Sequence, residues 1–272
     1  MAIHQYSFNV YKLHIISHET KQLISTATGF IGKKERRYYL ITNKHVVTGK
    51  HPTTNLLLDE KGRVPAYLKF EIPALKRDGE KIVKIQGKQI LPFPIYNDVV
   101  SILDSLWVEY PNDPTVDLAC MDITEKILPI ISQGYVDMAF DLDNFEEYPF
   151  KVMERVIVVG FPARESTLPN NFLVYKSAYI ASEPDVTNLK PYILIDGKTK
   201  SGMSGSPVVV HHSPEASAGP KGLELRFNKY SLIGLYSGRD VTDKTLTEAE
   251  LGLMWPISKY VIPTIESLKN LN

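Results

Sequence analysis

Short runs of apolar and β-branched residues recur along most of the chain, and Gly, Pro, Asn and Asp separate them. Such runs favour strands, because apolar side chains on every second residue cover one face of a sheet. We expect strands at residues 6–16, 23–31, 38–42, 81–85, 106–109, 118–123, 155–159, 172–180, 192–195, 206–210 and 231–236. Many short strands are typical of an all-β barrel or sandwich protein.

Helical periodicity is sustained only near the C-terminus, over residues 257–271. We expect this helix to pack on a barrel, with Pro263 either kinking it or lying in its first turn. Two further segments, 49–94 and 211–222, are rich in charged residues, proline or small residues, and we expect surface loops there. The apolar positions of the predicted helix are Ile257, Tyr260, Val261, Ile265 and Leu268.

Composition narrows the possible partners and compartment. The 272 residues are 43% hydrophobic, which supports a substantial core, and the 31 basic and 31 acidic residues favour neither nucleic acid nor an anionic membrane as a partner. Cys120 is the single cysteine, so no internal disulfide can form, which fits a reducing compartment. No run approaches the ~18 apolar residues of a membrane helix. We expect a cytoplasmic protein; a secreted chain that has lost its signal peptide is the alternative.

The segment 199–207, with the sequence Thr-Lys-Ser-Gly-Met-Ser-Gly-Ser-Pro, predicts a sharp turn before a strand. Gly202 and Gly205 lie on either side of Ser204, so the backbone can present a hydroxyl and free amides together. A serine becomes a strong nucleophile only beside a base. His45, which follows the predicted strand 38–42, is the candidate base, and Asp117 is the candidate carboxylate that orients it.

Each of these residues has an ordinary structural explanation when it is taken alone. A serine between glycines is usually only part of a turn, and a single histidine is more often hydrogen-bonded than catalytic. Other aspartates compete with Asp117, and spacing alone does not decide among them. The three residues together favour a Ser-His-Asp triad in which the amides of Gly202 and Ser204 bind an oxyanion. The competing aspartates are Asp98, Asp104, Asp113 and Asp122.

Six segments resemble the trypsin-like (chymotrypsin-fold) serine peptidases, and most closely the bacterial HtrA proteases. Segment 40–47 resembles the histidine motif, segment 117–119 the aspartate motif and segment 202–207 the serine motif. The others are segments 27–31, 159–162 and 233–238.

This resemblance implies two perpendicular six-stranded β-barrels with the triad between them. Residues 1–135 would form the first barrel with His45 and Asp117, residues 136–254 the second barrel with Ser204, and residues 255–272 a C-terminal helix. It also implies a serine endopeptidase that acts on a protein or peptide through a covalent acyl-enzyme.

The resemblance also assigns residues to substrate binding. Ser237 and Gly238 would line the cleft, with Lys198 and Arg239 near the pocket for the P1 side chain, which precedes the scissile bond. Basic groups there would favour an acidic P1 residue, whereas solvated lysines would leave the pocket to a small or apolar residue.

Met203 occupies the position where digestive members of the family carry an aspartate that captures a new N-terminus. Activation by that salt bridge is therefore not expected, and a protein activator that orders the loops around Ser204 is a hypothesis.

Other chemistries have weaker support. His211 and His212 have no Cys or acidic partner at metal-ligand spacing, so we expect no metal and no cofactor. A peptide-binding pseudo-peptidase with the same cleft is the main alternative. An acyl hydrolase on an unrelated fold is disfavoured, because its order along the chain would normally be Ser, acid, His.

Overall fold

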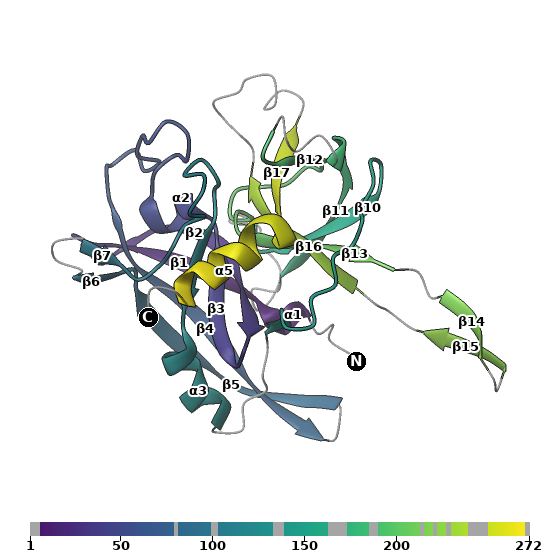
Figure 1. Cartoon of the computed structure of the whole chain (residues 1–272). Coiled ribbons are helices and arrows are strands. Elements are labelled where there is room, and N and C mark those ends of the chain that lie inside the picture. Colours follow the sequence, from purple (N-terminus) through teal and green to yellow (C-terminus); the bar gives the residue numbers. More distant parts are fainter. Residues whose placement is uncertain are drawn as a thin grey trace.

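The structure is a computed structural model that describes residues 6–78, 81–98, 103–132, 139–162, 173–184, 190–212, 215–219, 222–226, 230–238 and 250–269. Its N-terminal half is a curled sheet of seven strands in the order β5-β4-β1-β2-β3-β8, with β9 pairing in parallel with β2 (Figure 1). These strands are β1 Val10–Ser17, β2 Leu23–Lys34, β3 Arg37–Thr42, β4 Pro65–Asp78, β5 Lys81–Pro94, β8 Ala119–Asp122 and β9 Phe140–Asp141.

Strand β3 shows why this sheet lies at the centre of the molecule. Tyr38 and Leu40 pack into the core of the N-terminal half, while Tyr39 and Ile41 face the second half of the chain. Because both faces of β3 are covered, its sequence is apolar at nearly every position instead of alternating. Short elements surround this sheet: α1 Tyr6–Asn9, α2 Lys44–Thr48, β6 Tyr96–Asp98, β7 Leu103–Ser105 and α3 Thr124–Ser132.

The C-terminal half is a closed barrel of six antiparallel strands in the order β10-β11-β12-β17-β16-β13. A separate hairpin of β14 and β15 projects from it (Figure 1). The barrel strands are β10 Arg155–Gly160, β11 Val174–Ile180, β12 Ile193–Asp196, β13 Ser206–His211, β16 Tyr230–Gly238 and β17 Leu251–Pro256, and the hairpin strands are β14 Glu215–Gly219 and β15 Gly222–Arg226.

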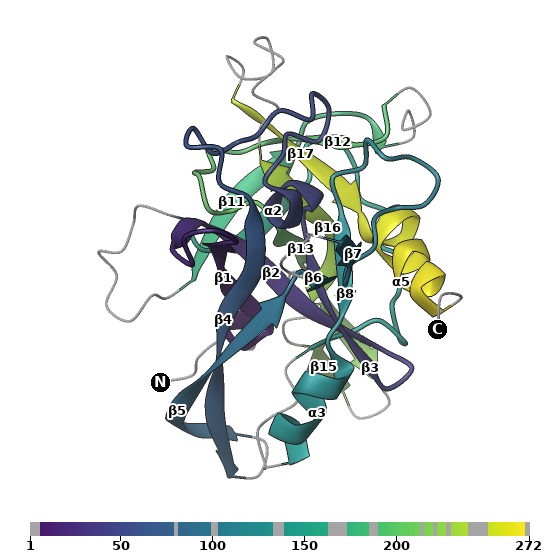
Figure 2. The same ribbon diagram turned by 90° about the vertical axis from the view of Figure 1, so that its left-hand side faces the viewer.

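The C-terminal segment lies across the junction of the two halves. A π-helical turn, η2 Ile257–Val261, leads into α5 Ile262–Lys269. Pro263 lies in the first turn of α5, which was one of the two positions predicted for it. Ile257 and Tyr260 share one buried cluster with Phe30 of β2 and Leu235 of β16. Figures 1 and 2 both show α5 beside the two halves. The segment therefore helps to hold the two halves together.

The predicted all-β fold, the closed second barrel and the C-terminal helix are confirmed. The first half differs in detail from a closed six-stranded barrel, because its seven described strands form a curled sheet. Since β9 pairs with β2, the first sheet includes residues beyond the proposed boundary at residue 135, which stays a prediction. No helix in the described parts of the chain is long and apolar enough to cross a membrane.

Several element predictions were wrong. Residues 49–94 are not a single loop: β4 and β5 form a long hairpin that extends away from the body (Figure 2). Helix α3 was missed because it is short and contains Pro129. Residues 6–9 form a helical turn rather than the start of a strand, and segment 106–109 contributes only a bridge between Val108 and Cys120. Strand β17 was not predicted, and β14 occupies part of the predicted loop 211–222.

Candidate active site

His45 and Asp117 meet at the junction of the two halves. His45 lies in α2, and Asp117 precedes β8 by two residues. The His45 Nδ1 atom lies 2.6 Å from Asp117 Oδ2, and the backbone amide of His45 donates to Asp117 Oδ1 at 2.9 Å. Both carboxylate oxygens therefore hold His45, one through the ring and one through the backbone. This contact fixes Nδ1–H as the donor to the carboxylate and leaves Nε2 as the basic nitrogen.

The Asp117 carboxyl is almost completely buried, with 3% of its side chain exposed. Burial raises its pKa, but the neighbouring His45 charge and the hydrogen bonds from His45 and Ser237 outweigh that effect and hold the pKa below its ordinary value. The carboxylate is thus ionised near neutral pH. A buried anion is tolerated here because three donors surround it.

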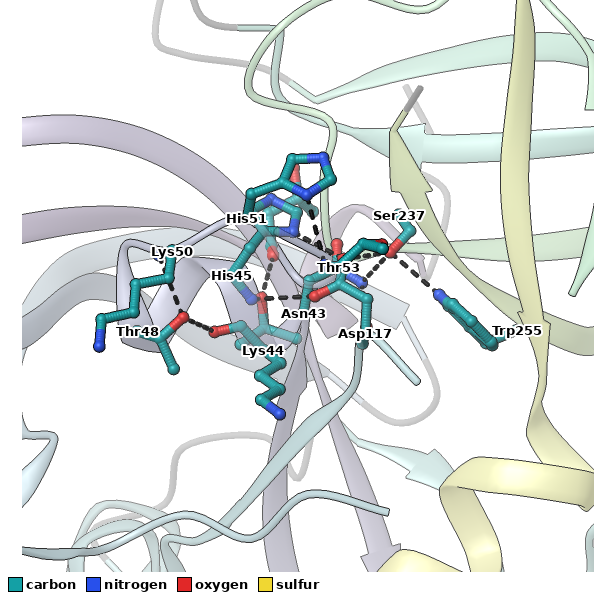
Figure 3. Close-up of polar contacts among 12 residues, drawn as sticks. Asn43, Lys44, His45, Thr48, Lys50, His51, Thr53, Asp117, Ser237 and Trp255 are labelled. Carbon is teal, nitrogen blue, oxygen red and sulfur yellow. Dashed lines mark hydrogen bonds and ion pairs between the residues drawn. The ribbon is translucent and has the colours of Figure 1, made fainter. Parts of the chain in front are cut away.

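Ser237 is the third donor to Asp117. Its hydroxyl donates to Asp117 Oδ2, and it accepts hydrogen bonds from Asn43 Nδ2 and Trp255 Nε1, each at 3.0 Å (Figure 3). Asn43 Nδ2 also donates to the Asp117 backbone carbonyl at 2.7 Å. Because an indole nitrogen can only donate, the hydroxyl proton of Ser237 must point at the carboxylate. The resemblance assigned Ser237 to substrate binding, which stays a prediction; the structure places its hydroxyl against Asp117.

Ser204 occupies a tight turn between Lys200 and Ser206. Gly202 has a φ of 94° and Gly205 a φ of 84°, which are left-handed values that glycine adopts without strain. A Cβ atom on Gly205 would lie 2.0 Å from the Thr28 carbonyl oxygen, so the turn approaches β2 very closely. The glycines on either side of Ser204 are therefore required by the backbone, as the sequence suggested.

The turn leaves two amides available beside the hydroxyl. The backbone N–H groups of Gly202 and Ser204 donate to no carbonyl within the described residues, whereas those of Met203, Gly205 and Ser206 are all bonded. Met203 N donates to Lys200 O at 3.3 Å and Gly205 N to Tyr236 O at 2.8 Å. Two unbonded amides next to a nucleophile are the groups that an oxyanion hole needs.

Two cavities meet at His45 and Ser204. The first, of about 590 Å³, extends toward β16 and β17 and includes Tyr192, Leu253 and Trp255 in its lining. The second, of about 640 Å³, extends toward β2 and the segment after α2, where Lys61 and Arg63 are among its lining residues. No hydrogen bond joins His45 to Ser204 in the structure. In substrate-free enzymes this contact is often long and tightens on binding.

The predicted specificity residues are placed unevenly. Gly238 lines the first cavity together with Ser237. The Lys198 side chain is 76% exposed and its Nζ atom lies 3.5 Å from Glu250, and it is not among the described residues that line either cavity. Arg239 lies outside the described residues. The basic P1 pocket therefore stays a prediction that rests on the resemblance.

Met203 is fully buried in the core of the second barrel, near Tyr236 and Met254. An apolar environment offers no partner for a charged N-terminus. Within the described residues, no group of His, Cys, Asp and Glu side chains is arranged to hold a metal ion. Cys120 is buried in the cluster between the halves, and burial raises the pKa of its thiol. Its environment is that of a packing residue.

The sequence did not point to Asn43 or Trp255. Asn43 is two residues before His45 in the histidine motif, so its position there was the one available signal. Trp255 lies in β17, which was not predicted as a strand, and only the barrel brings it to Ser237.

Comparisons with known proteins give a family match. A family model described as a trypsin-like peptidase domain matches residues 27–213. No curated protein sequence matches the chain. Among solved structures, the chain resembles the inactive form of a serine-to-alanine mutant of Rv3671c from Mycobacterium tuberculosis H37Rv, with 16% identity and a TM-score of 0.45 over 97% of this chain and 88% of that one.

Proposed function

Because the chain belongs to the family of trypsin-like peptidase domains, we propose that it is a serine endopeptidase in which Ser204, His45 and Asp117 form the catalytic triad. The observation that carries this proposal is the contact of His45 Nδ1 with the buried Asp117 Oδ2 at 2.6 Å, beside a cavity that Ser204 also lines. The pair leaves His45 Nε2 as a base beside the cavity that Ser204 lines, and the amides of Gly202 and Ser204 in the turn there donate to no carbonyl among the described residues.

In this mechanism His45 Nε2 removes the Ser204 hydroxyl proton while Oγ bonds to the carbonyl carbon of the scissile peptide. The amides of Gly202 and Ser204 stabilise the oxyanion that forms, and the Asp117 carboxylate stabilises the imidazolium. His45 then gives its proton to the leaving amine, and an acyl-enzyme on Ser204 results. Water, deprotonated by His45, releases the acid and restores Ser204.

The substrate side chain that enters the first cavity meets mainly apolar groups. Tyr192, Leu253 and Trp255 supply aromatic and aliphatic surface, and the carboxylate of Asp117 is bound to His45. These contacts support the alternative of a small or apolar P1 residue over an acidic one. A peptide library decides between them: cleavage only after Asp or Glu would restore the acidic preference and the roles of Lys198 and Arg239.

The proposal that a protein partner activates the enzyme is based on the buried Met203. A chain with no acidic residue beside its nucleophile has to keep the turn around Ser204 ordered by other means. Adding a candidate partner should raise kcat without removing any N-terminal residue. A requirement for N-terminal proteolysis would contradict this proposal. We further propose that the enzyme acts in the cytoplasm on a protein or peptide substrate.

The second candidate is a peptide-binding pseudo-peptidase, in which the two cavities at His45 and Ser204 would hold a peptide without cutting it. A fluorophosphonate probe separates the two functions, because it reacts only with an activated serine. We expect labelling of the wild-type protein and none of Ser204→Ala, with a loss of at least ~1,000-fold in rate for His45→Ala. Peptide binding without Ser204-dependent labelling, also with cell extract added as a source of activator, would favour the binding module.

A further inference from the structure

Thr28 of β2 bonds directly to the turn around Ser204 from the first sheet. It is fully buried, and its amide, carbonyl and hydroxyl take part in four hydrogen bonds. Its backbone amide donates to the Ser204 carbonyl at 2.8 Å, and its hydroxyl donates to the Gly202 carbonyl at 2.8 Å. The hydroxyl accepts from the Phe161 amide at 3.0 Å, and its own carbonyl accepts from the Thr42 hydroxyl at 2.9 Å.

The direction of the hydroxyl proton follows from these partners. The Phe161 amide can only donate, so it occupies a lone pair of Thr28 Oγ1. The Gly202 carbonyl can only accept, so it receives the proton. Since Thr28 is β-branched and buried, its side chain has few rotamers in which it could leave this arrangement. The hydroxyl is therefore a fixed donor to Gly202.

The contact acts on the peptide plane beside the proposed oxyanion hole. The Gly202 carbonyl and the Met203 amide belong to one peptide group, and Thr28 holds the carbonyl while Lys200 O accepts from the amide. Gly202 is the third residue of a turn from Lys200 to Met203 and has a φ of 94°, which suits a type II turn. Glycine can rotate out of this conformation easily, because it has no side chain to restrict it.

We propose that the Thr28 hydroxyl is a positioning residue for the oxyanion hole: it holds the peptide after Gly202 so that the Gly202 amide stays directed toward the substrate. This inference rests on the proposed peptidase function. Thr28 touches no reacting atom itself, and its effect passes through the Gly202 backbone. The first sheet thereby controls the transition-state donor that the second barrel supplies.

The test uses three variants. Thr28→Val keeps the shape of the side chain and removes the hydroxyl, Thr28→Ser keeps the hydroxyl, and Thr264→Val is the matched control. Thr264 is also fully buried and donates its hydroxyl to a backbone carbonyl, that of Tyr260, but it lies in α5. Loss of a whole oxyanion donor costs roughly 100- to 1,000-fold in kcat, so a misdirected one should cost about 10- to 100-fold.

We expect Thr28→Val to lower kcat by that factor with little change in KM. The variant should also weaken the binding of a peptide boronic acid, which forms a tetrahedral adduct, far more than the binding of a product peptide. Thr28→Ser should recover kcat to within about threefold, and Thr264→Val should lose stability while keeping kcat. An unchanged kcat in Thr28→Val, no recovery in Thr28→Ser, or an equal loss of kcat in Thr264→Val would overturn the inference.

A structural measurement separates this inference from the proposed function. Crystal structures of the wild-type protein and Thr28→Val, both without substrate, report the orientation of the Gly202 peptide whether or not the protein is active. We expect the Gly202 carbonyl to have rotated in the variant, and an unmoved carbonyl overturns the positioning role. Absence of Ser204-dependent labelling in the wild-type protein would instead refute the peptidase function.

Discussion

Replacing Ser237 with alanine tests the support of Asp117 most directly. The change removes a charge-assisted hydrogen bond to a buried carboxylate, worth ~1.5–3 kcal/mol, and leaves Trp255 Nε1 without its partner in a buried site, which costs a further ~1–3 kcal/mol. Asn43 keeps its bond to the Asp117 carbonyl. We expect the free energy of unfolding at pH 7.5 to fall by about 3–5 kcal/mol in urea titrations, and kcat/KM to fall about tenfold.

The pH dependence of the same variant distinguishes an electrostatic role from simple packing. The pKa of Asp117 is lowered in the folded protein, so its contribution to stability is present above the ordinary carboxyl pKa of 3.8 and is lost as the pH falls through the folded value. Ser237→Ala raises the folded pKa, so less of this stability is present at neutral pH and its loss is complete at a higher pH. We expect acid unfolding, followed by circular dichroism, to have a higher midpoint in the variant.

The matched control is Ser231→Ala, which removes another hydroxyl of β16, bonded to His212 far from the carboxylate. It should leave both kcat/KM and the acid midpoint close to their wild-type values. If Ser237→Ala kept wild-type kcat/KM and an unshifted acid midpoint, the hydroxyl would not be supporting Asp117, and the reasoning from the three hydrogen bonds would be refuted.

Three further predictions follow from the site and its surroundings. Trp255→Phe removes the indole donor to Ser237 and should lower kcat/KM about 2- to 10-fold in a peptide assay; an unchanged value would show that Asn43 alone fixes the hydroxyl. Gly205→Ala forces a Cβ atom to within 2.0 Å of the Thr28 carbonyl oxygen. Fluorophosphonate labelling should therefore be lost, and the free energy of unfolding should fall by at least ~3 kcal/mol. Near-native labelling would contradict that close approach. The buried Cys120, whose thiol pKa is raised, should resist a disulfide reagent in the native protein and react fully in urea.

The sequence was informative about the site wherever the chemistry is local. The turn around Ser204 needs glycines at positions 202 and 205, and the segment around His45 carries its motif in consecutive residues, so both were found without coordinates. The acid was chosen by motif, and the structure brings Asp117 to His45. Contacts between distant segments were not visible: Ser237 is 120 residues from Asp117, and no periodicity predicts their meeting.

The fold shows the same division. Strand β4 has alternating buried residues, Ala66, Leu68, Phe70 and Ile72, so the period-two signal was present in the sequence. Lys69 and Glu71 lie between them, and the charged and proline-rich composition of segment 49–94 concealed the pattern. Strand β17 was missed for a different reason: Gly252 interrupts its apolar run, and its pairing with β12 and β16 comes from closure of the barrel.

The two halves of the molecule support each other's proposed catalytic groups. Asp117 belongs to the first half, yet Ser237 and Trp255 of the second barrel fix the hydrogen bonds around its carboxylate. Ser204 belongs to the second barrel, yet Thr28 of the first sheet holds the peptide groups on both sides of it. Neither half therefore contains a complete site by itself. Any change that loosens the junction should reduce kcat before it unfolds either half, because the proposed mechanism requires both sets of contacts at once.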